Sequence, residues 1–333
     1  MSELLADDPE WADVVPIRQY ENVNPIAPIF YSEEYKDATD YFRGVLKTGE
    51  MSPRVLQLTE RIIRMNPAHY TAWQHRYKTV IALKIPLEEE LELMNDIATT
   101  FLKTYQVWHH RRLLLTALNS IDAAARELEF LKTVLRADAK NYHTWSFRQW
   151  ILAHFNDEER LWAGERAYIE DLLEQDVRNN SAWHHRFFVV FSSGIRLGDE
   201  DRDQMLRREL SFVKEKIALA PNNPSAWNYL RGALEHTNTP FSTLTTFVEL
   251  YTTSQPPSRG RDEDVVDLDN PPPSAGAQLP AVAALEFLAD IYEKEGGDAS
   301  AKAVEIWKSL ANEKDVIRKK YWEYRIRDAL SKA

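Results

Sequence analysis

The sequence predicts an all-α fold built from stacked helical hairpins. Five tryptophans lie inside near-copies of one short phrase, and successive tryptophans are 35, 37, 38 and 44 residues apart. Tandem units of this length are typical of stacked helical hairpins and not of a single globular core. Glycine is scarce, with 10 in 333 residues, which suits a mostly helical chain. The five copies are HYTAWQHR at 69–76, TYQVWHHR at 104–111, NYHTWSFR at 141–148, NNSAWHHR at 179–186 and NPSAWNYL at 223–230.

Each unit is predicted to contain two helices. In the first unit, apolar residues three and four positions apart give the first helix one apolar face. The dipeptide Asn66-Pro67 is expected to end that helix and to start the second, because Asn is a good N-cap and Pro fits the first helical turn. The second helix carries Tyr70, Trp73, Tyr77 and Ile81, again at helical spacing. The first apolar face consists of Val55, Leu58, Ile62 and Met65.

The sequence divides into an N-terminal arm, residues 1–31, and a helical-repeat domain, residues 32–333. The arm is irregular and contains several prolines, and it could lie on a partner. Residues 35–46 are predicted to form a lead-in helix. Residues 254–280 are rich in Pro, Ser, Asp and Gly, which predicts an exposed insertion loop. A sixth, weaker copy of the repeat phrase lies at 321–325.

Composition narrows the class of protein. The net charge of −11 argues against nucleic acid or an anionic membrane as the main partner. The chain has no cysteine, so it cannot supply a thiolate nucleophile or a cysteine zinc ligand, and a cytoplasmic location is expected. The N-terminus has no apolar segment of the signal-peptide kind, and no stretch approaches 18 apolar residues, so membrane insertion is not expected.

The recurring tryptophans and arginines are predicted to be structural. Large rings at a fixed place on every second helix would pack between neighbouring hairpins. An arginine follows the tryptophan by three residues in four units, and it is expected to bridge helix ends or to pair with a carboxylate of the next hairpin. The pairs His109-His110 and His184-His185 do not suggest a metal site, because neighbouring helical residues point about 100° apart. The four arginines are Arg76, Arg111, Arg148 and Arg186.

Two lysines precede the second helix in adjacent units, Lys103 and Lys140. A lysine at a helix N-terminus meets the positive end of the helix dipole, and two such lysines from neighbouring repeats would repel each other. An anion between them, such as a phosphate or a diphosphate, would remove the conflict and could also bind backbone N–H groups. The alternative, that both lysines are simply solvated, stays open on spacing alone.

Several phrases resemble the protein prenyltransferase alpha-subunit repeat, most closely in the alpha subunits shared by protein farnesyltransferase and protein geranylgeranyltransferase type I. The resemblance covers most of the chain, and the segment 254–280 departs from it. It implies a right-handed superhelix, or crescent, that wraps around a beta subunit. The phrases that carry it are YQVWHHRR at 105–112, KNYHTW at 140–145, DVRNN at 176–180 and SAWNY at 225–229.

The resemblance also implies a reaction. Such a heterodimer transfers a farnesyl or geranylgeranyl group from its diphosphate to the cysteine of a C-terminal CaaX motif in a protein substrate. The beta subunit holds the zinc and most of the isoprenoid pocket, and magnesium bound with the diphosphate is also allowed. The choice of isoprenoid would depend on the beta subunit.

Position by position, the resemblance assigns Lys103 to the isoprenoid diphosphate and Tyr105 to the border of the same site. Gln106 matches a glutamine that binds the C-terminal carboxylate of the protein substrate, and Tyr70 matches a tyrosine near the bound peptide. The family has Asn where this chain has Thr104, and because Thr can still cap a helix, we expect this difference to matter little.

The next unit supplies Asn141, Tyr142 and His143, which the resemblance puts at the edge of the site or at the subunit interface. Two alternatives compete with this assignment. One is a non-catalytic scaffold of tetratricopeptide type, although the drifting period and the Trp-x-x-Arg phrase fit it poorly. The other is the alpha subunit of Rab geranylgeranyltransferase, which has the same repeats.

Overall fold

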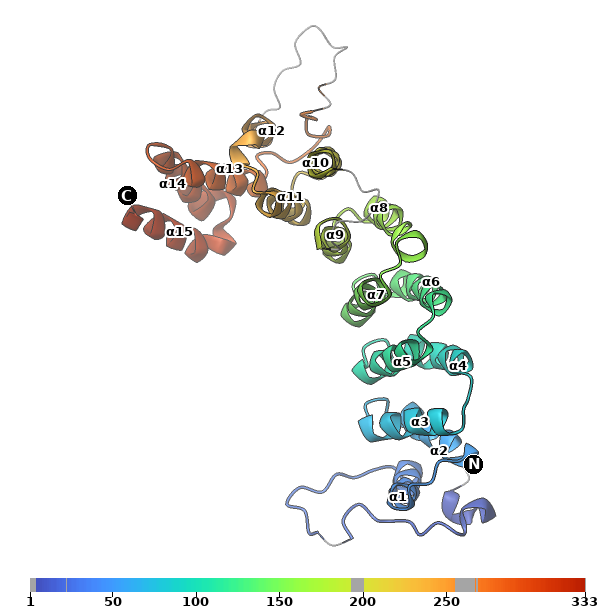
Figure 1. Ribbon diagram of the computed structural model, residues 1–333. Coiled ribbons are helices and arrows are strands. Elements are labelled where there is room, and N and C mark those ends of the chain that lie inside the picture. Colours follow the sequence, from blue (N-terminus) through green and yellow to red (C-terminus); the bar gives the residue numbers. More distant parts are fainter. Residues whose placement is uncertain (1–3, 22, 193–200, 255–266, 268, 333) are drawn as a thin grey trace. The chain divides into compact units, whose positions relative to one another are not determined.

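The computed structural model describes residues 4–21, 23–192, 201–254, 267 and 269–332, and within them the regular structure is entirely helical. The prediction of an all-α fold of helical hairpins is therefore confirmed. The chain divides into two compact units, Met1–Leu161 and Trp162–Ala333, and each is described by itself. Figure 1 shows the helices running in antiparallel pairs along the chain. No helix among the described residues is long and apolar enough to span a lipid bilayer.

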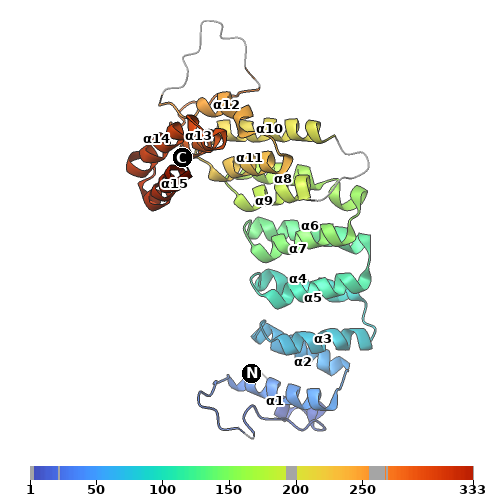
Figure 2. The ribbon, with the colours of Figure 1, turned by 60° about the vertical axis from the view of Figure 1, so that its left-hand side comes forward.

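The first unit stacks three hairpins, α2–α3, α4–α5 and α6–α7, behind the lead-in helix α1. Figure 2 shows these hairpins as successive layers, with the turn inside each hairpin at the same side of the stack. The helices are α1 (Glu33–Thr48), α2 (Pro53–Met65), α3 (Tyr70–Ala82), α4 (Leu87–Thr100), α5 (Tyr105–Leu118), α6 (Ile121–Ala137) and α7 (Tyr142–Phe155). Short helical turns occur at Leu5–Asp7 and Pro9–Trp11, and another at Glu158–Trp162.

The second unit continues the plan with α8–α9 and α10–α11 and ends in a packed group of three helices. Its helices are α8 (Glu165–Gln175), α9 (Asn180–Phe187), α10 (Arg202–Leu219), α11 (Pro224–Thr237), α12 (Thr245–Glu249), α13 (Val282–Glu295), α14 (Ala299–Ser309) and α15 (Lys319–Lys332). Short helical turns occur at Phe188–Ser192, Phe241–Leu244, Leu310–Lys314 and Val316–Arg318.

Every repeat tryptophan is buried, as predicted, and each indole also makes a hydrogen bond that the sequence did not reveal. The indole N–H donates to the backbone carbonyl six residues earlier, in the turn between the two helices of the hairpin. The ring thus fills the space between helices and fixes the turn before it. The pairs are Trp73 to Pro67 at 2.8 Å, Trp108 to Leu102 at 3.0 Å, Trp145 to Ala139 at 3.0 Å, Trp183 to Val177 at 2.8 Å and Trp227 to Pro221 at 2.8 Å.

The buried arginines join consecutive hairpins. Arg76 on α3 makes a two-pronged ion pair with Glu90 on α4, with N–O distances of 2.7 and 2.8 Å. Arg111 on α5 pairs in the same way with Glu127 on α6, at 2.6 and 2.7 Å. In the second unit, Arg186 on α9 pairs with Glu209 on α10, at 2.7 and 3.1 Å. The prediction that these arginines meet a carboxylate of the next hairpin is confirmed for these three pairs.

The weaker sixth copy uses the same two residue types with different partners. Trp322 is fully buried, and its indole N–H donates to the carboxylate of Asp315 at 3.1 Å. Arg325, three residues later, pairs with Asp290 at 2.8 Å and Glu293 at 2.7 Å. Its guanidinium also lies over the ring of Trp307, 4.6 Å from the centroid. The terminal helix is therefore held by the same pair of residue types as the repeats.

Two details of the first hairpin differ from the prediction. Asn66 is the C-cap of α2 and does not start the next helix, because its side chain accepts a hydrogen bond from the backbone N–H of Ala68 and so holds a tight turn. The N-cap of α3 is His69, whose Nδ1 accepts from the backbone N–H of Ala72 at 3.2 Å.

The buried face of α3 also differs. Trp73 is buried, whereas Tyr70 and Ile81 are exposed, so the residues at helical spacing do not form one core face. The core positions of α3 include two polar residues, His75 and Arg76, which a count of apolar residues leaves out. They can be buried because each has a hydrogen-bond partner. The full buried set is Ala72, Trp73, His75, Arg76, Thr79 and Val80.

Residues 4–17, here called the N-terminal cover, pack on α1 at the outer side of the first hairpin. Trp11 is buried with its ring against Tyr41, at 5.9 Å between centroids. The guanidinium of Arg54 lies over the Trp11 ring and bonds the carboxylates of Asp13 and Glu50. Residues 4–17 thus belong to the folded unit.

A close backbone contact completes this packing. A Cβ atom on Gly44 would lie 2.5 Å from the carbonyl oxygen of Val15, so α1 needs glycine where the N-terminal cover crosses it. Ile17 is held beyond the crossing, because its N–H donates to the carbonyl of Asp40 at 2.9 Å and its carbonyl accepts from Arg43 at 2.7 Å.

The predicted insertion loop is only partly covered by the described residues, since 255–266 and 268 lie outside them. Its later part is bonded to the repeats. The Ser274 N–H donates to the carbonyl of Ala218 at 2.9 Å, and the Asn222 amide donates to the carbonyl of Gln278 at 2.8 Å. Residues 269–280 therefore run along α10 and the turn after it.

His110 is buried on α5 and its Nε2 lies 2.9 Å from the Glu90 carboxylate. Burial lowers the pKa of His110, and the neutral Nε2–H form fits the surroundings because Nδ1 is buried without a hydrogen-bond partner. Burial by itself would raise the pKa of the Glu90 carboxyl. The hydrogen bonds from His110 and Arg76 outweigh burial, so the pKa of this group is lowered.

We predict that acid weakens the fold through His110. Below its unfolded pKa of about 6.5, the unfolded chain binds a proton at this residue and the folded chain does not. The free energy of unfolding should therefore fall as the pH drops from about 7.5 to 5.5, and more steeply in the wild type than in His110→Gln. Denaturant titrations at several pH values would measure this. The exposed neighbour variant His109→Gln should keep the wild-type slope, and an unchanged slope in His110→Gln would contradict the prediction.

Candidate functional site

Most of the predicted site residues lie at one end of the hairpins in the first unit. Each hairpin turns there through a short segment, residues 66–69, 101–104 and 138–141, here called the tip turns. The tip turns and the first residues of α3, α5 and α7 form one side of the stack, here called the tip edge (Figure 2). Side chains that project from this edge are available to a partner or a ligand.

The two predicted lysines occupy equivalent places on this edge. Lys103 lies in the tip turn between α4 and α5, and Lys140 lies in the next one, between α6 and α7. Both side chains are exposed. The lysines do not stand inside the helices that follow, which begin two residues later, at Tyr105 and Tyr142.

The turn that carries Lys103 is held by the residue next to it. The carbonyl of Leu102 accepts two hydrogen bonds, from the Trp108 indole at 3.0 Å and from the side-chain amide of Asn141 at 3.3 Å. One donor comes from the same hairpin and the other from the next. The two tip turns are thereby linked, and the backbone beneath Lys103 is fixed from both sides.

Asn141 was predicted to border the substrate, and its side chain is buried and engaged within the chain. Its Oδ1 accepts from the backbone N–H of Thr144 at 3.1 Å, which caps α7, while its amide bonds Leu102. The second unit repeats the arrangement, because the carbonyl of Val177 accepts from the Trp183 indole and from the Asn223 amide at 2.7 Å. The recurrence of Asn four residues before Trp was the signal for this linkage in the sequence.

Rings gather beside the two lysines. Tyr105, the first residue of α5, stacks on His109 with 6.2 Å between centroids and meets the edge of His143 at 6.3 Å. Tyr142 lies against His143 at 5.7 Å. The structure therefore brings Tyr105, Tyr142 and His143 together across two hairpins. His109 joins them, and it was not among the predicted site residues.

The remaining predicted residues lie on the same edge. Tyr70 begins α3 as Tyr105 begins α5 and Tyr142 begins α7, and these three tyrosines are 65 to 77% exposed. Gln106 follows Tyr105 in the first turn of α5 and is partly exposed. The edge thus offers phenol hydroxyls, imidazoles, an amide and two ammonium groups, which suit hydrogen bonding to an anionic ligand.

Thr104 does not behave as expected. It precedes α5, yet its side chain makes no capping hydrogen bond, whereas Asn141 caps α7. It also has no amide with which to reach the carbonyl of Pro67, as Asn141 reaches Leu102. The expectation that Thr104 caps α5 is therefore wrong.

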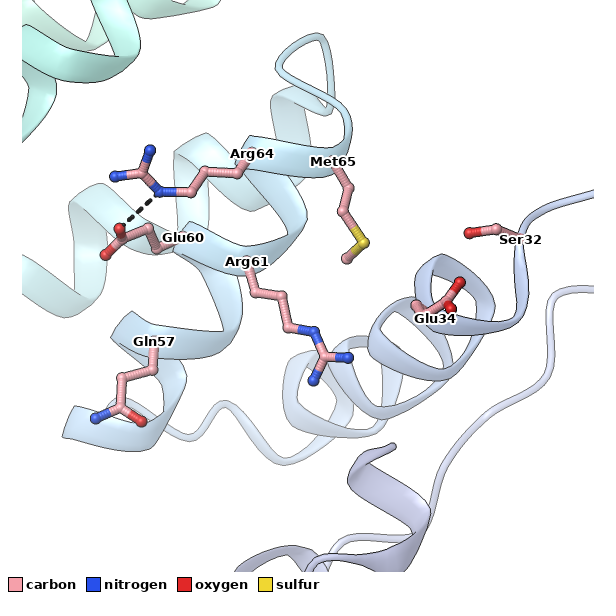
Figure 3. Close-up of a pocket in the computed structure, with 7 residues that line it drawn as sticks. All are labelled: Ser32, Glu34, Gln57, Glu60, Arg61, Arg64 and Met65. Atoms are coloured by element: carbon pink, nitrogen blue, oxygen red, sulfur yellow. Dashed lines mark hydrogen bonds and ion pairs between the residues drawn. The ribbon is translucent and has the colours of Figure 1, made fainter. Parts of the chain in front are cut away.

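A shallow, open hollow of about 740 Å³ lies elsewhere in the first unit, between the start of α1 and α2. Figure 3 shows its lining, in which Arg64 is ion-paired with Glu60 at 2.9 Å. The same guanidinium also binds Asp96 at 2.7 Å. None of the predicted site residues lines this hollow. Among the described residues, no group of three or more His, Asp or Glu side chains could hold a metal ion.

Comparison with known proteins decides the family. The protein prenyltransferase alpha subunit repeat matches at 52–83, 87–118, 124–155, 162–193 and 206–237. The protein farnesyltransferase/geranylgeranyltransferase type-1 subunit alpha of Schizosaccharomyces pombe is 37% identical over 326 residues, which cover 97% of this chain and 95% of that protein. The chain belongs to this alpha-subunit family. The Arabidopsis thaliana member is 44% identical over 222 residues, which cover 67% of this chain and 66% of that protein.

A solved structure agrees with the family. A chain of Candida albicans protein geranylgeranyltransferase-I complexed with GGPP is 29% identical, with a TM-score of 0.80 over 95% of this chain and 97% of that one. The predicted family is confirmed: the chain is a member of the alpha subunits of type-1 protein farnesyltransferase/geranylgeranyltransferase. The scaffold and Rab-type alternatives are not favoured by these relatives.

We predict that Thr104→Asn stabilises the chain. Asn can accept the N–H groups at the start of α5 and can donate to the carbonyl of Pro67, so the free energy of unfolding should rise by about 0.5–1.5 kcal/mol. Urea titration of the chain would measure the change. Thr116→Asn makes the same replacement at an exposed position in the last turn of α5, where no backbone N–H groups of a helix start are left to cap, and should bring no gain. Equal stability of Thr104→Asn and the wild type would contradict the prediction.

Proposed function

We propose that the heterodimer transfers a farnesyl or geranylgeranyl group from its diphosphate to the cysteine of a C-terminal CaaX motif, and that Lys103 binds the diphosphate. The observation that supports this most is the double hydrogen bond to the carbonyl of Leu102, which fixes the backbone beneath an exposed ammonium group. The GGPP bound in the Candida albicans enzyme supports an isoprenoid diphosphate as the ligand class.

The role of Lys103 follows from the charge of the leaving group. As the bond between C1 of the isoprenoid and the diphosphate oxygen breaks, negative charge grows on the diphosphate. A cation that is already in position stabilises this charge without reorganising. Lys140 on the next tip turn adds positive charge to the same edge. Magnesium bound with the diphosphate would act in the same sense.

The tip-edge rings and amides would orient the substrates. Tyr105 would border the diphosphate, and Gln106 would donate a hydrogen bond to the C-terminal carboxylate of the protein substrate. Tyr70, Tyr142 and His143 would contact the peptide or the beta subunit. Asn141 would act at the edge of the same site, where its amide already holds the Lys103 turn.

The nucleophile must come from outside this chain, which contains no cysteine. Zinc held by the beta subunit would lower the pKa of the substrate cysteine and supply a thiolate. The thiolate forms a thioether with C1 of the isoprenoid as the diphosphate departs with the bonding electrons. This chain contributes a scaffold, a cationic contact to the leaving group and a hydrogen bond for the peptide terminus.

We predict that Lys103→Ala slows the chemical step by about 10- to 1000-fold, since one charge-assisted contact in the transition state contributes about 1.5–4 kcal/mol. Single-turnover assays on the purified heterodimer would measure it. Lys78→Ala removes another exposed lysine of the first unit and should leave the rate unchanged. A normal rate in Lys103→Ala would exclude the proposed contact.

We predict that Gln106→Ala weakens binding of the CaaX peptide about tenfold while the rate at saturating peptide changes little, because the contact exists before and during reaction. Peptide titrations under single-turnover conditions separate the two quantities. The matched variant Gln74→Ala changes an exposed glutamine on α3 and should bind peptide normally. Unchanged peptide affinity with a slower reaction would contradict the assigned role.

A further inference from the structure

The loop between the N-terminal cover and α1, residues 18–31, exposes a group of large apolar side chains. Val23, Ile26, Ile29 and Phe30 are 62 to 106% exposed. The part of the loop that carries them is devoid of charge, because residues 22–32 contain no Asp, Glu, Lys or Arg in a chain that is 28% charged. Apolar side chains gathered in this way mark a surface that another molecule covers.

The loop is held in place at both ends and across its middle. Ile17 is bonded to α1 before the loop, and Ser32 caps α1 after it by accepting from the Tyr35 N–H. The Tyr20 hydroxyl accepts from the backbone N–H of Ile29 at 2.9 Å, which ties the two arms of the loop together. Hydrogen bonds thus tie the loop that carries the apolar side chains to α1 and across its own middle. Binding of a partner would therefore cost little additional conformational entropy.

The loop is continuous with the tip edge. The ring of Tyr31 lies 4.7 Å from that of Tyr35, and the Tyr35 ring lies 6.4 Å from that of His69, the N-cap of α3. The Asn66 amide also donates to the Tyr35 hydroxyl at 2.8 Å. Figure 2 shows the loop on the same side of the stack as the tip turns. Contacts through the half-buried Tyr31, Tyr35 and His69 therefore connect the exposed loop to the exposed residues at the start of α3.

We propose that Val23, Ile26, Ile29 and Phe30 form a docking surface for the beta subunit. The tip edge carries the residues of the proposed reaction, and the remaining reaction components belong to the beta subunit, so the subunit that covers the edge also reaches the loop beside it. A surface that binds an anionic membrane or a nucleic acid would carry Lys or Arg side chains, and residues 22–32 contain neither. The proposal rests on the heterodimer of this family and does not require that Lys103 contacts the diphosphate.

A competition assay tests the proposal. Wild-type and Ile26→Asp/Phe30→Asp alpha subunits with different tags are co-expressed with a limiting amount of beta subunit, and mass spectrometry counts each form in the purified heterodimer. We expect the variant to be under-represented by about tenfold or more. The control is Val15→Asp, an exposed apolar residue of the N-terminal cover whose backbone lies beside Gly44 and which is not part of the group of four. It should compete as the wild type does.

Covalent footprinting of the unmodified heterodimer gives a second readout that does not depend on any variant. Labelling of Phe30 should fall on addition of the beta subunit, while labelling of Val15 should persist. Equal incorporation of the variant together with unchanged labelling of Phe30 would overturn the proposal. It would also be overturned if Phe30 were protected only by vesicles of phosphatidylserine and phosphatidylcholine, or only by self-association of the alpha subunit. A variant that assembles normally with the beta subunit but reacts more slowly would bear on the proposed reaction and would count against the docking surface.

Discussion

The shape of the tip edge depends on one kind of interaction, a turn carbonyl that accepts a hydrogen bond from a buried indole N–H. In the turns at Leu102 and Val177, the N-cap asparagine of the next hairpin donates to the same oxygen. These bonds satisfy backbone groups that the end of a helix would otherwise leave unpaired. They also make each tip turn a fixed platform. The exposed residues of the edge can then hold a defined geometry although they lie in a turn and not in a helix.

A second set of contacts fixes how one hairpin follows the next. Arg76 and Arg111 each reach forward to a buried glutamate, and the first of these glutamates also receives His110 from its own hairpin. Burial without a partner would cost several kcal/mol for each of these charges, so the pairs form in one register only. The polar pairs therefore determine the register in which one hairpin packs on the next. The tryptophans and aliphatic side chains supply most of the buried surface.

The sequence predicted the fold class and the roles of Trp and Arg because both depend on period and residue type alone. The sequence did not predict burial or capping where these depend on contacts with residues of another helix or on the path of a turn. Tyr70 and Ile81 have the right spacing for a core face, but the paired residues His75 and Arg76 take that face instead. The failure of Thr104 to cap α5 depends on the local path of a turn, which spacing does not specify. The lysines and tyrosines of the tip edge could be located from the repeat register, although their ligands could not be read from it.

The N-terminal cover has a consequence for how far the array can extend. A stack of hairpins presents an apolar face at its ends, and an uncovered end invites another copy to add there. In this chain Trp11 and the crossing at Gly44 lay a stretch of irregular backbone over the outer side of α1, where a further helix would otherwise pack. A further helix could pack on that side of α1 only by displacing this stretch of backbone.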